Sequence, residues 1–392
     1  MRTTTRAALA GLLAATATSA AATAATAADT DVDAAPLLAA SGDVVEGRYI
    51  VMLEEGATAA AGERRAAAHG GEVVATYDAL GGYAADLTAA ELDAVRDDPA
   101  VAFVQPDTIV TTAEVEVAGT QTGATWGLDR IDQAALPLDG TYTYDATGAG
   151  VTAYVIDTGI DSDHPELGGR VTSGIDTIGD GNGTEDCQGH GTHVAGTIGS
   201  TTYGVAKEVD LVAVRVLGCD GSGSTAGVID GMDWVAADAT GASVANMSLG
   251  GPADSATDAA VDRMVDAGVT VAVAAGNEST DACSSSPAAA ASALTVAASN
   301  DADELAYFSN YGSCVDVIAP GEAITSTWTG GGVRTISGTS MAAPHVAGAA
   351  ALYLEGDPGA SPATVTDALL GAATPGVVTG TAGSPNLLLH TP

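Results

Sequence analysis

The feature that most constrains the fold of this chain is an alternation of short apolar runs and longer helical stretches from Gly119 onward. In chain order, the expected elements lie at residues 150–156, 190–197, 210–216, 225–239, 243–247, 255–267 and 270–274. Strands that alternate with helices pair in parallel, because a crossover helix returns the chain to the same end of the sheet. The sequence therefore predicts a doubly wound α/β domain, with a mostly parallel sheet covered by helices on both faces.

A different pattern precedes this domain, between about residues 45 and 110. Strands are expected at 48–53, 73–77, 82–87 and 101–104, and helices at 59–69 and 88–96. The second helix begins with Thr88 followed three residues later by Glu91, the spacing of a capping box. The order strand, helix, strand, strand, helix, strand predicts a small ferredoxin-like α+β domain.

The first residues have the pattern of a secretory signal. Met1–Arg6 carries two arginines, and an Ala- and Leu-rich run with small residues follows as far as Ala28. This pattern predicts a signal peptide over residues 1–28 and a secreted, extracellular protein, although an Ala-rich tail would share the composition. No other stretch reaches about 18 uninterrupted apolar residues, so a membrane span is not expected.

Three polar residues stand where nucleophilic catalysis would need them. Ser340 lies in Gly-Thr-Ser-Met-Ala at the start of an Ala-rich helix, Asp157 ends an apolar run, and His190 opens Gly-His-Gly-Thr-His. A serine hydroxyl needs an imidazole base, and that base needs a group to orient it. Alone, these residues could be an N-cap, a turn residue and part of a helix face. Together they indicate a catalytic triad, with His193 pointing elsewhere one turn later.

These three motifs, in the order Asp, His, Ser, resemble those of the subtilases over about residues 45–392. Segments 126–132, 214–217 and 308–312 resemble the secreted, proteinase K-like branch. The resemblance implies a subtilisin-type serine endopeptidase domain at 119–392, behind an inhibitory propeptide at 29–118 that is cut off in the linker 111–119. The N-terminal domain could instead be a permanent accessory domain.

Two other classes of function remain as alternatives. An α/β-hydrolase esterase has its serine in Gly-x-Ser-x-Gly and its histidine last in the chain. Here Ala342 takes the place of the final glycine, and His190 precedes Ser340. A catalytically silent subtilase-fold surface or binding protein is the other alternative. Silent copies usually lose a triad residue, and this chain keeps all three.

The resemblance also assigns roles at the site. His190 would take the proton of Ser340, Asp157 would orient the imidazole, and Asn277 would donate to the oxyanion, a donor whose loss costs subtilisin roughly 100- to 1,000-fold in rate. Two segments would pair with an extended peptide as extra strands: Gly221, Ser222 and Gly223, and Ser248, Leu249 and Gly250. Leu249, Gly250 and Ala274 would line a roomy apolar pocket. The implied activity is broad hydrolysis of proteins, with a preference for large apolar or aromatic residues before the cut.

The chain has four cysteines, which in a secreted protein are expected to form disulfides. Sequence alone leaves three pairings open, and a zinc site with Cys187 and nearby histidines is a further alternative. The resemblance implies bridges between Cys187 and Cys219 and between Cys283 and Cys314.

Calcium is the cofactor that the resemblance implies, as a structural ion. Its strong site would use Asp316 with the carbonyls of Ala291 and Ala293. A second site would use Asp129, Asp132, Gln133 and Asp139. For a third site, before the catalytic histidine, Asp176 is present but Gly181 replaces a carboxylate, with Asp180 one place away.

The net charge of −38 limits the partners of this protein. From Gly119 onward there are 32 acidic and 6 basic residues, and Lys207 is the only lysine. Such a surface disfavours nucleic acid and anionic membranes. We expect a monomer whose partners are protein or peptide substrates and its own propeptide. The charge suggests adaptation to salt, which screens repulsion, or simply an acidic secreted enzyme.

Overall fold

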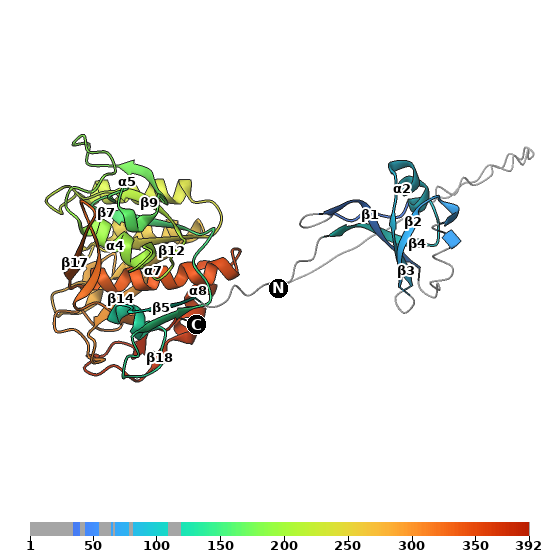
Figure 1. Cartoon of the computed structure of the whole chain (residues 1–392). Helices are drawn as coiled ribbons and strands as arrows, with labels where there is room; N and C mark the ends of the chain where they lie inside the picture. The colour runs from blue at the N-terminus through green and yellow to red at the C-terminus, as the bar shows by residue number, and fades with distance from the viewer. Residues whose placement is uncertain are drawn as a thin grey trace, which may run out of the picture. The chain divides into compact units, whose positions relative to one another are not determined.

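The computed structural model describes residues 34–39, 44–54, 64–65, 67–77, 81–108 and 119–391. The chain divides into two compact units, Met1–Ala113 and Glu114–Pro392 (Figure 1). The expected signal peptide, about half of the helix expected at 59–69 and the linker as far as residue 118 lie outside the described residues. Within the described ranges, none of the helices is both long and apolar enough to cross a membrane.

The first unit contains a four-stranded antiparallel sheet in the order β2-β3-β1-β4. Its elements are β1 (Val44–Leu53), β2 (Glu72–Tyr77), β3 (Gly82–Asp86), α2 (Ala89–Arg96) and β4 (Val101–Thr108). Helix α2 begins with the expected capping box, in which Thr88 and Glu91 bond to each other's backbone N–H groups. Leu92 and Val95 of α2 share a buried core with strand residues such as Val51. This arrangement is consistent with the ferredoxin-like fold expected from the sequence.

The second unit is built on a nine-stranded sheet in the order β18-β19-β15-β14-β12-β10-β7-β9-β8. The strands are β7 (Thr152–Asp157), β8 (Val171–Asp176), β9 (Asp210–Arg215), β10 (Ser243–Met247), β12 (Thr270–Ala274), β14 (Leu294–Ser299), β15 (Val317–Pro320), β18 (Thr374–Pro375) and β19 (Leu387–Leu388). All pairs are parallel except β18 with β19. The predicted doubly wound, mostly parallel sheet is confirmed.

Helices cover both faces of this sheet, as Figure 1 shows for α5 and α7. The helices are α3 (Trp126–Ile131), α4 (His190–Gly199), α5 (Thr225–Asp238), α6 (Ser255–Asp266), α7 (Thr339–Gly356) and α8 (Pro362–Ala372), with 3-10 turns at Pro165–Leu167 and Ala282–Ser284. Alternate residues of β7 separate the two cores. Ala153 and Val155 pack with α4 and α7, whereas Tyr154 and Ile156 pack with α5 and α6. This alternation follows from the period of two in a strand.

Three two-stranded sheets complete the unit. They pair β5 (Gly119–Thr122) with β6 (Thr141–Tyr144), β11 (Gly251–Pro252) with β13 (Ser285–Ser286), and β16 (Ile324–Trp328) with β17 (Gly332–Ile336). The β16–β17 hairpin contacts α4, whose first residue is His190. Sequence periodicity does not mark this hairpin, because its residues alternate little between apolar and polar types.

The carboxyl ends of three neighbouring strands meet at one edge of the sheet. Asp157 ends β7, Ser248 follows β10, and Asn277 comes three residues after β12. Strand β7 is flanked by β10 on one side and β9 on the other, so the chain order reverses there. Sites in open α/β sheets form at such reversals, outside the carboxyl ends of the strands.

Candidate active site

Asp157 is held rigidly at the end of β7. It pairs with Arg215 of β9 in the ladder, its side chain is fully buried, and one carboxylate oxygen accepts the N–H of Thr158 at 2.7 Å. A buried carboxylate must be paired, because an isolated charge away from water is costly. Its partner is the imidazole of His190.

His190 is the first residue of α4, and its Nδ1 lies 2.8 Å from Asp157 Oδ1 and 3.0 Å from Oδ2. Burial alone would lower the pKa of His190. The charge of Asp157 and its hydrogen bond outweigh burial, Asp186 adds to them, and the pKa is raised. The carboxylate thus fixes Nδ1 as the protonated nitrogen and leaves Nε2 able to accept a proton.

The residue before the histidine must be a glycine. Gly189 has φ 112°, and a Cβ there would overlap the indole ring of Trp328 in β16. His193, one turn later, directs Nε2 at the carbonyls of Ile324 and Arg334, 3.1 Å from each. Burial lowers the pKa of His193 to about 4. The second histidine of the motif is therefore a neutral contact to the β16–β17 hairpin.

Ser340 is the second residue of α7, and its surroundings explain the sequence that follows it. Pro344 has no N–H to give to the carbonyl of Ser340, as the next helical turn would otherwise do. That carbonyl instead accepts the hydroxyl of Ser248 at 2.7 Å. The hydroxyl of Ser340 donates to the carbonyl of Ser248 at 3.2 Å, and no hydrogen bond joins it to His190.

Thr339 orients the side chain of Asn277. Asn277 Oδ1 accepts from the N–H of Thr339 at 2.8 Å and from its hydroxyl at 3.0 Å. The hydroxyl oxygen of Thr339 in turn accepts the N–H of Gly276 at 3.1 Å. With its oxygen engaged, the amide keeps its two N–H donors for the cavity beside Ser340. Sequence reasoning did not identify Thr339, whose contact to Asn277 spans 62 residues.

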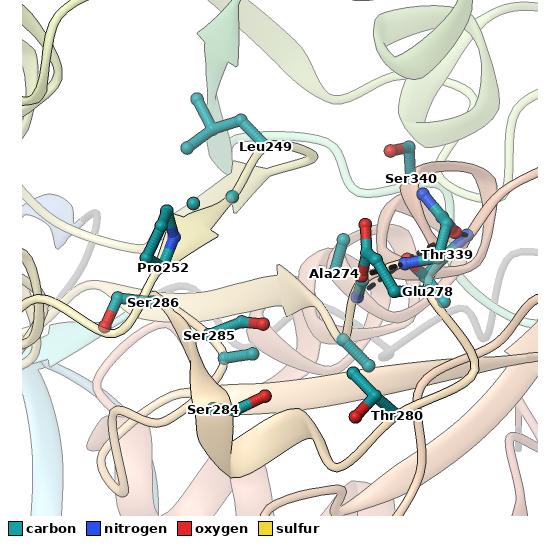
Figure 2. Close-up of a pocket in the computed structure, with 16 residues that line it drawn as sticks. Leu249, Pro252, Ala274, Glu278, Thr280, Ser284, Ser285, Ser286, Thr339 and Ser340 are labelled. Carbon is teal, nitrogen blue, oxygen red and sulfur yellow. Dashed lines mark hydrogen bonds between the residues drawn. The ribbon is translucent and has the colours of Figure 1, made fainter.

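Ser340 and Asn277 line a cavity of about 450 Å³ (Figure 2). Leu249, Gly250 and Ala274, which the resemblance implies as pocket residues, line it. Polar residues also contribute, in a way not foreseen: Glu278, Thr280, Ser284, Ser285 and Ser286. In Figure 2, Leu249 and Pro252 lie across the cavity from Ser340 and Glu278. The cavity is roomy, with walls of mixed rather than uniformly apolar character.

A second cavity, of about 530 Å³, adjoins the first. The two predicted peptide-binding segments contribute to it together: Gly221, Ser222 and Gly223, and Ser248, Leu249 and Gly250. His190 lines the same cavity. The fold therefore brings both segments beside the imidazole, although they lie on either side of α5 in the sequence.

Both disulfides expected from the resemblance are present, between Cys187 and Cys219 and between Cys283 and Cys314. The zinc alternative is excluded for these thiols, since no cysteine is free. Within the described ranges, the one group of three potential metal ligands within 4.8 Å consists of Asp180 and the first disulfide. Bridged sulfurs are not thiolate ligands.

The carboxylates that the resemblance implies as calcium ligands differ in their surroundings. Asp132 Oδ1 is buried without a hydrogen-bond partner. Burial raises the pKa of Asp132, and the charges of Asp129 and Asp139 raise it further. Asp129 accepts the N–H groups of Asp139 and Gly140, at 3.2 and 2.8 Å. An orphaned buried oxygen facing like charges fits a cation, although these three carboxylates do not converge within 4.8 Å.

Asp316 differs from Asp176 and Asp180, the carboxylates of the possible third site, in whether a basic side chain neutralises it. Burial raises the pKa of Asp316, whose Oδ2 accepts the N–H of Thr295 at 2.8 Å, and no ion pair of a described residue involves it. Asp180, by contrast, accepts two N–H groups of Arg215, each at 2.7 Å. Asp176 Oδ1 lies 3.5 Å from Nη1 of the same arginine. The first carboxylate fits a hard cation, whereas a guanidinium already neutralises the other two.

Comparisons with known proteins agree with this geometry. Residues 148–388 match the Subtilase family, and residues 48–113 match Peptidase inhibitor I9. The extracellular serine proteinase of Thermus sp. (strain Rt41A) is 50% identical over 385 residues, covering 91% of this chain and 93% of the relative. Proteinase T of Parengyodontium album is 52% identical over 258 residues, covering 64% of this chain and 86% of the relative. A crystal structure of a cold-adapted subtilisin-like serine proteinase is 54% identical with a TM-score of 0.68, and covers 69% of this chain and 99% of that one.

Proposed function

This chain belongs to the subtilase family of serine endopeptidases, and from that premise we propose that it is a secreted, broadly acting protease made as a self-processing zymogen. One observation carries the assignment of its catalytic residues. The imidazole of His190 is clamped through Nδ1 by the buried carboxylate of Asp157, 2.8 Å away. That clamp leaves Nε2 to act as a base at the edge of the cavity system that also holds Ser340.

The proposed reaction begins with a rotation of the Ser340 side chain from the carbonyl of Ser248 toward His190. His190 Nε2 takes the hydroxyl proton as Ser340 Oγ attacks the scissile carbonyl, and the imidazolium formed is stabilised by Asp157. The same proton then passes to the leaving amine. Water, activated by His190 in turn, hydrolyses the acyl-enzyme.

Negative charge that develops on the carbonyl oxygen would be met by two donors. They are the side-chain amide of Asn277 and the backbone N–H of Ser340 near the N-terminus of α7, where peptide dipoles favour an anion. Thr339 fixes the amide before substrate arrives, because it occupies Asn277 Oδ1 with two donors. Such a donor needs no reorientation during the reaction.

The substrate would lie extended between the segments 221–223 and 248–250, pairing with their backbones as an added strand. The residue before the cut would enter the 450 Å³ cavity, which accommodates large apolar or aromatic side chains. Glu278, an exposed lining residue, places a carboxylate there that can also meet a basic side chain. The mixed lining therefore supports a broad specificity that includes both large apolar and basic side chains before the cut.

The N-terminal unit is proposed as the transient inhibitor of the enzyme. Residues 48–113 match an inhibitor family, and the proposed cut near Ala118–Gly119 would release residues 29–118. Residue 119 begins β5, which pairs with β6 through Gly119 and Tyr144. A Cβ at Gly119 would overlap the Tyr144 ring, so this first residue must be small.

We also propose calcium as a structural ion. Asp316 with the carbonyls of Ala291 and Ala293 would hold one ion, and Asp129, Asp132, Gln133 and Asp139 a second. Such an ion would neutralise carboxylates whose pKa values are raised by burial, and would stabilise the folded state that binds it. The strong negative charge argues against nucleic acid or anionic membranes as partners, and a monomer suffices for the activity.

The test of the proposed function is labelling with a serine-reactive fluorophosphonate, followed by peptide mapping. The proposal requires the label on Ser340 and its loss in Ser340→Ala. Absence of labelling in a chain that cleaves no protein would favour a silent binding protein. Label on another serine would refute the assignment.

A further inference from the structure

A second buried carboxylate lies close to the catalytic pair, and the mechanism above does not use it. Asp186 is 9% exposed and accepts five hydrogen bonds. Its Oδ1 accepts the hydroxyl of Thr158 at 3.0 Å and the N–H groups of Gln188 and Gly189 at 2.9 and 2.8 Å. Its Oδ2 accepts the N–H and the hydroxyl of Thr192, at 2.9 and 2.6 Å.

These donors come from the two segments that carry Asp157 and His190. Thr158 follows Asp157 directly, and its hydroxyl oxygen also accepts the N–H of Gly191 at 2.9 Å. The other donors flank His190: Gln188 and Gly189 precede α4, and Thr192 lies in its first turn. Gly189, the N-cap of this helix, has no side chain with which to cap it, so other side chains satisfy the free N–H groups of the first turn. Asp186 accepts that of Thr192, Thr158 that of Gly191, and Gln188 Oε1 that of His190.

We propose that Asp186 is a positioning residue, which fixes His190 against Asp157 and contributes negative charge to the imidazolium formed during catalysis. This inference rests on the proposed role of His190 as the base. Asp186 touches neither cavity, so it acts through His190 and not on the substrate. A small displacement of a catalytic group can lower the rate roughly a hundredfold.

Several charged groups surround this pair and must be considered in a pH experiment. From β7, Asp157 raises the pKa of His190 most strongly, against the lowering effect of burial, and Asp186 raises it further. His193 lies on the same helix, and the hairpin carries Arg334 over the ring of Trp328. Arg215, on β9, carries a positive charge near Asp186 that offsets part of the effect of Asp186 on His190.

The experiment compares Asp186→Asn with wild-type enzyme on an uncharged peptide substrate. It measures kcat and KM over the pH range in which kcat/KM falls toward acid, the acidic limb of the pH profile. We expect kcat to fall roughly tenfold to a hundredfold with KM nearly unchanged. The acidic limb should move to lower pH, because loss of the Asp186 charge makes protonation of His190 less favourable. A merely structural role would lower the active fraction without moving the limb.

Thr192→Val separates geometry from charge and serves if the first variant folds poorly. It removes the 2.6 Å hydroxyl bond and keeps the charge of Asp186. It should lower kcat while leaving the acidic limb in place. Glu355→Gln is the matched control, because Glu355 Oε2 likewise accepts three N–H groups, from residues 147, 148 and 149. It should change neither kcat nor the limb.

An Asp186→Asn enzyme with kcat within about twofold of wild type, a change under half a kcal/mol, and a superimposable limb would overturn the inference. Equal effects of Glu355→Gln would overturn it as well. Failure of the proposed function would look different, since the wild-type enzyme itself would then show no activity that depends on His190.

Discussion

The orientation of Asn277 by Thr339 gives a prediction whose magnitude can be worked from the structure. Thr339→Val is nearly isosteric at a fully buried position. It removes the 3.0 Å hydroxyl bond to Asn277 Oδ1 but keeps the 2.8 Å bond from the backbone N–H. It also leaves the N–H of Gly276, which the hydroxyl accepted at 3.1 Å, without that partner.

Two separate effects follow from this change. One neutral hydrogen bond is worth about 1 kcal/mol net, so weaker orientation of the amide should lower kcat about fivefold. That is far less than the roughly 100- to 1,000-fold loss expected for complete removal of the donor in Asn277→Ala. The unsatisfied N–H of Gly276 should lower the free energy of unfolding by about 1 to 3 kcal/mol.

The assay measures kcat and KM on an uncharged chromogenic peptide and Tm by calorimetry. KM and the pH dependence should stay unchanged, since no charge near His190 is altered. Thr391→Val is the control, because the hydroxyl of this buried threonine donates to the carbonyl of Ile131, remote from the site. A normal kcat despite a lowered Tm in Thr339→Val, or a change in KM alone, would refute the idea that Thr339 positions the oxyanion donor.

Four further predictions concern the metal ligands, the cavity beside Ser340, the propeptide and its removal. Chelation of calcium should lower Tm, because buried carboxylates would face one another unscreened, and Asp316→Asn should blunt the response; a Tm indifferent to chelator and to added calcium would remove the proposed ions. Glu278→Gln should lower kcat/KM for substrates with lysine before the cut and leave those with phenylalanine unchanged, and equal changes for both would contradict a role in charge recognition. The released propeptide carries 18 acidic and 4 basic residues against 32 and 6 on the mature part, so inhibition in trans should strengthen with added salt, and steady weakening would mean that ion pairs dominate. A Ser340→Ala precursor should stay uncut in a protease-free host, and processing there would exclude self-cleavage.

Local patterns were enough to predict the main elements of the fold. Strands β10 and β12 have the predicted bounds, because each is a short run rich in apolar residues that lies between nearby glycines. The capping box at Thr88 formed as its spacing predicts. Asp157 and His190 share one edge of the sheet because the carboxyl ends of parallel strands and the starts of the helices that follow them lie at the same edge.

Residues whose partners are distant in sequence could not be predicted in this way. Asp186 and Thr339 lie 28 and 62 residues from Thr158 and Asn277, the side chains to which they bond, and no periodic pattern links such positions. Glu278 was missed for a related reason: the loop that turns it into the cavity follows β12 without regular structure. The motif indicated that Ser340 lies at the start of a helix, as it does in α7, but not the direction of its hydroxyl, which depends on the carbonyl of Ser248.

The proposed mechanism requires that Asp157, His190 and Ser340 act as one catalytic unit. The direct measurement is kcat for Asp157→Asn, His190→Ala, Ser340→Ala and the triple variant, on one peptide substrate with the amount of folded enzyme matched. We predict that His190→Ala and Ser340→Ala each lose roughly 10,000-fold or more, and that the triple variant is hardly slower, because the losses of a unit do not add. A His190→Ala enzyme that kept more than about a hundredth of wild-type turnover, or losses that multiplied in the triple variant, would contradict the account.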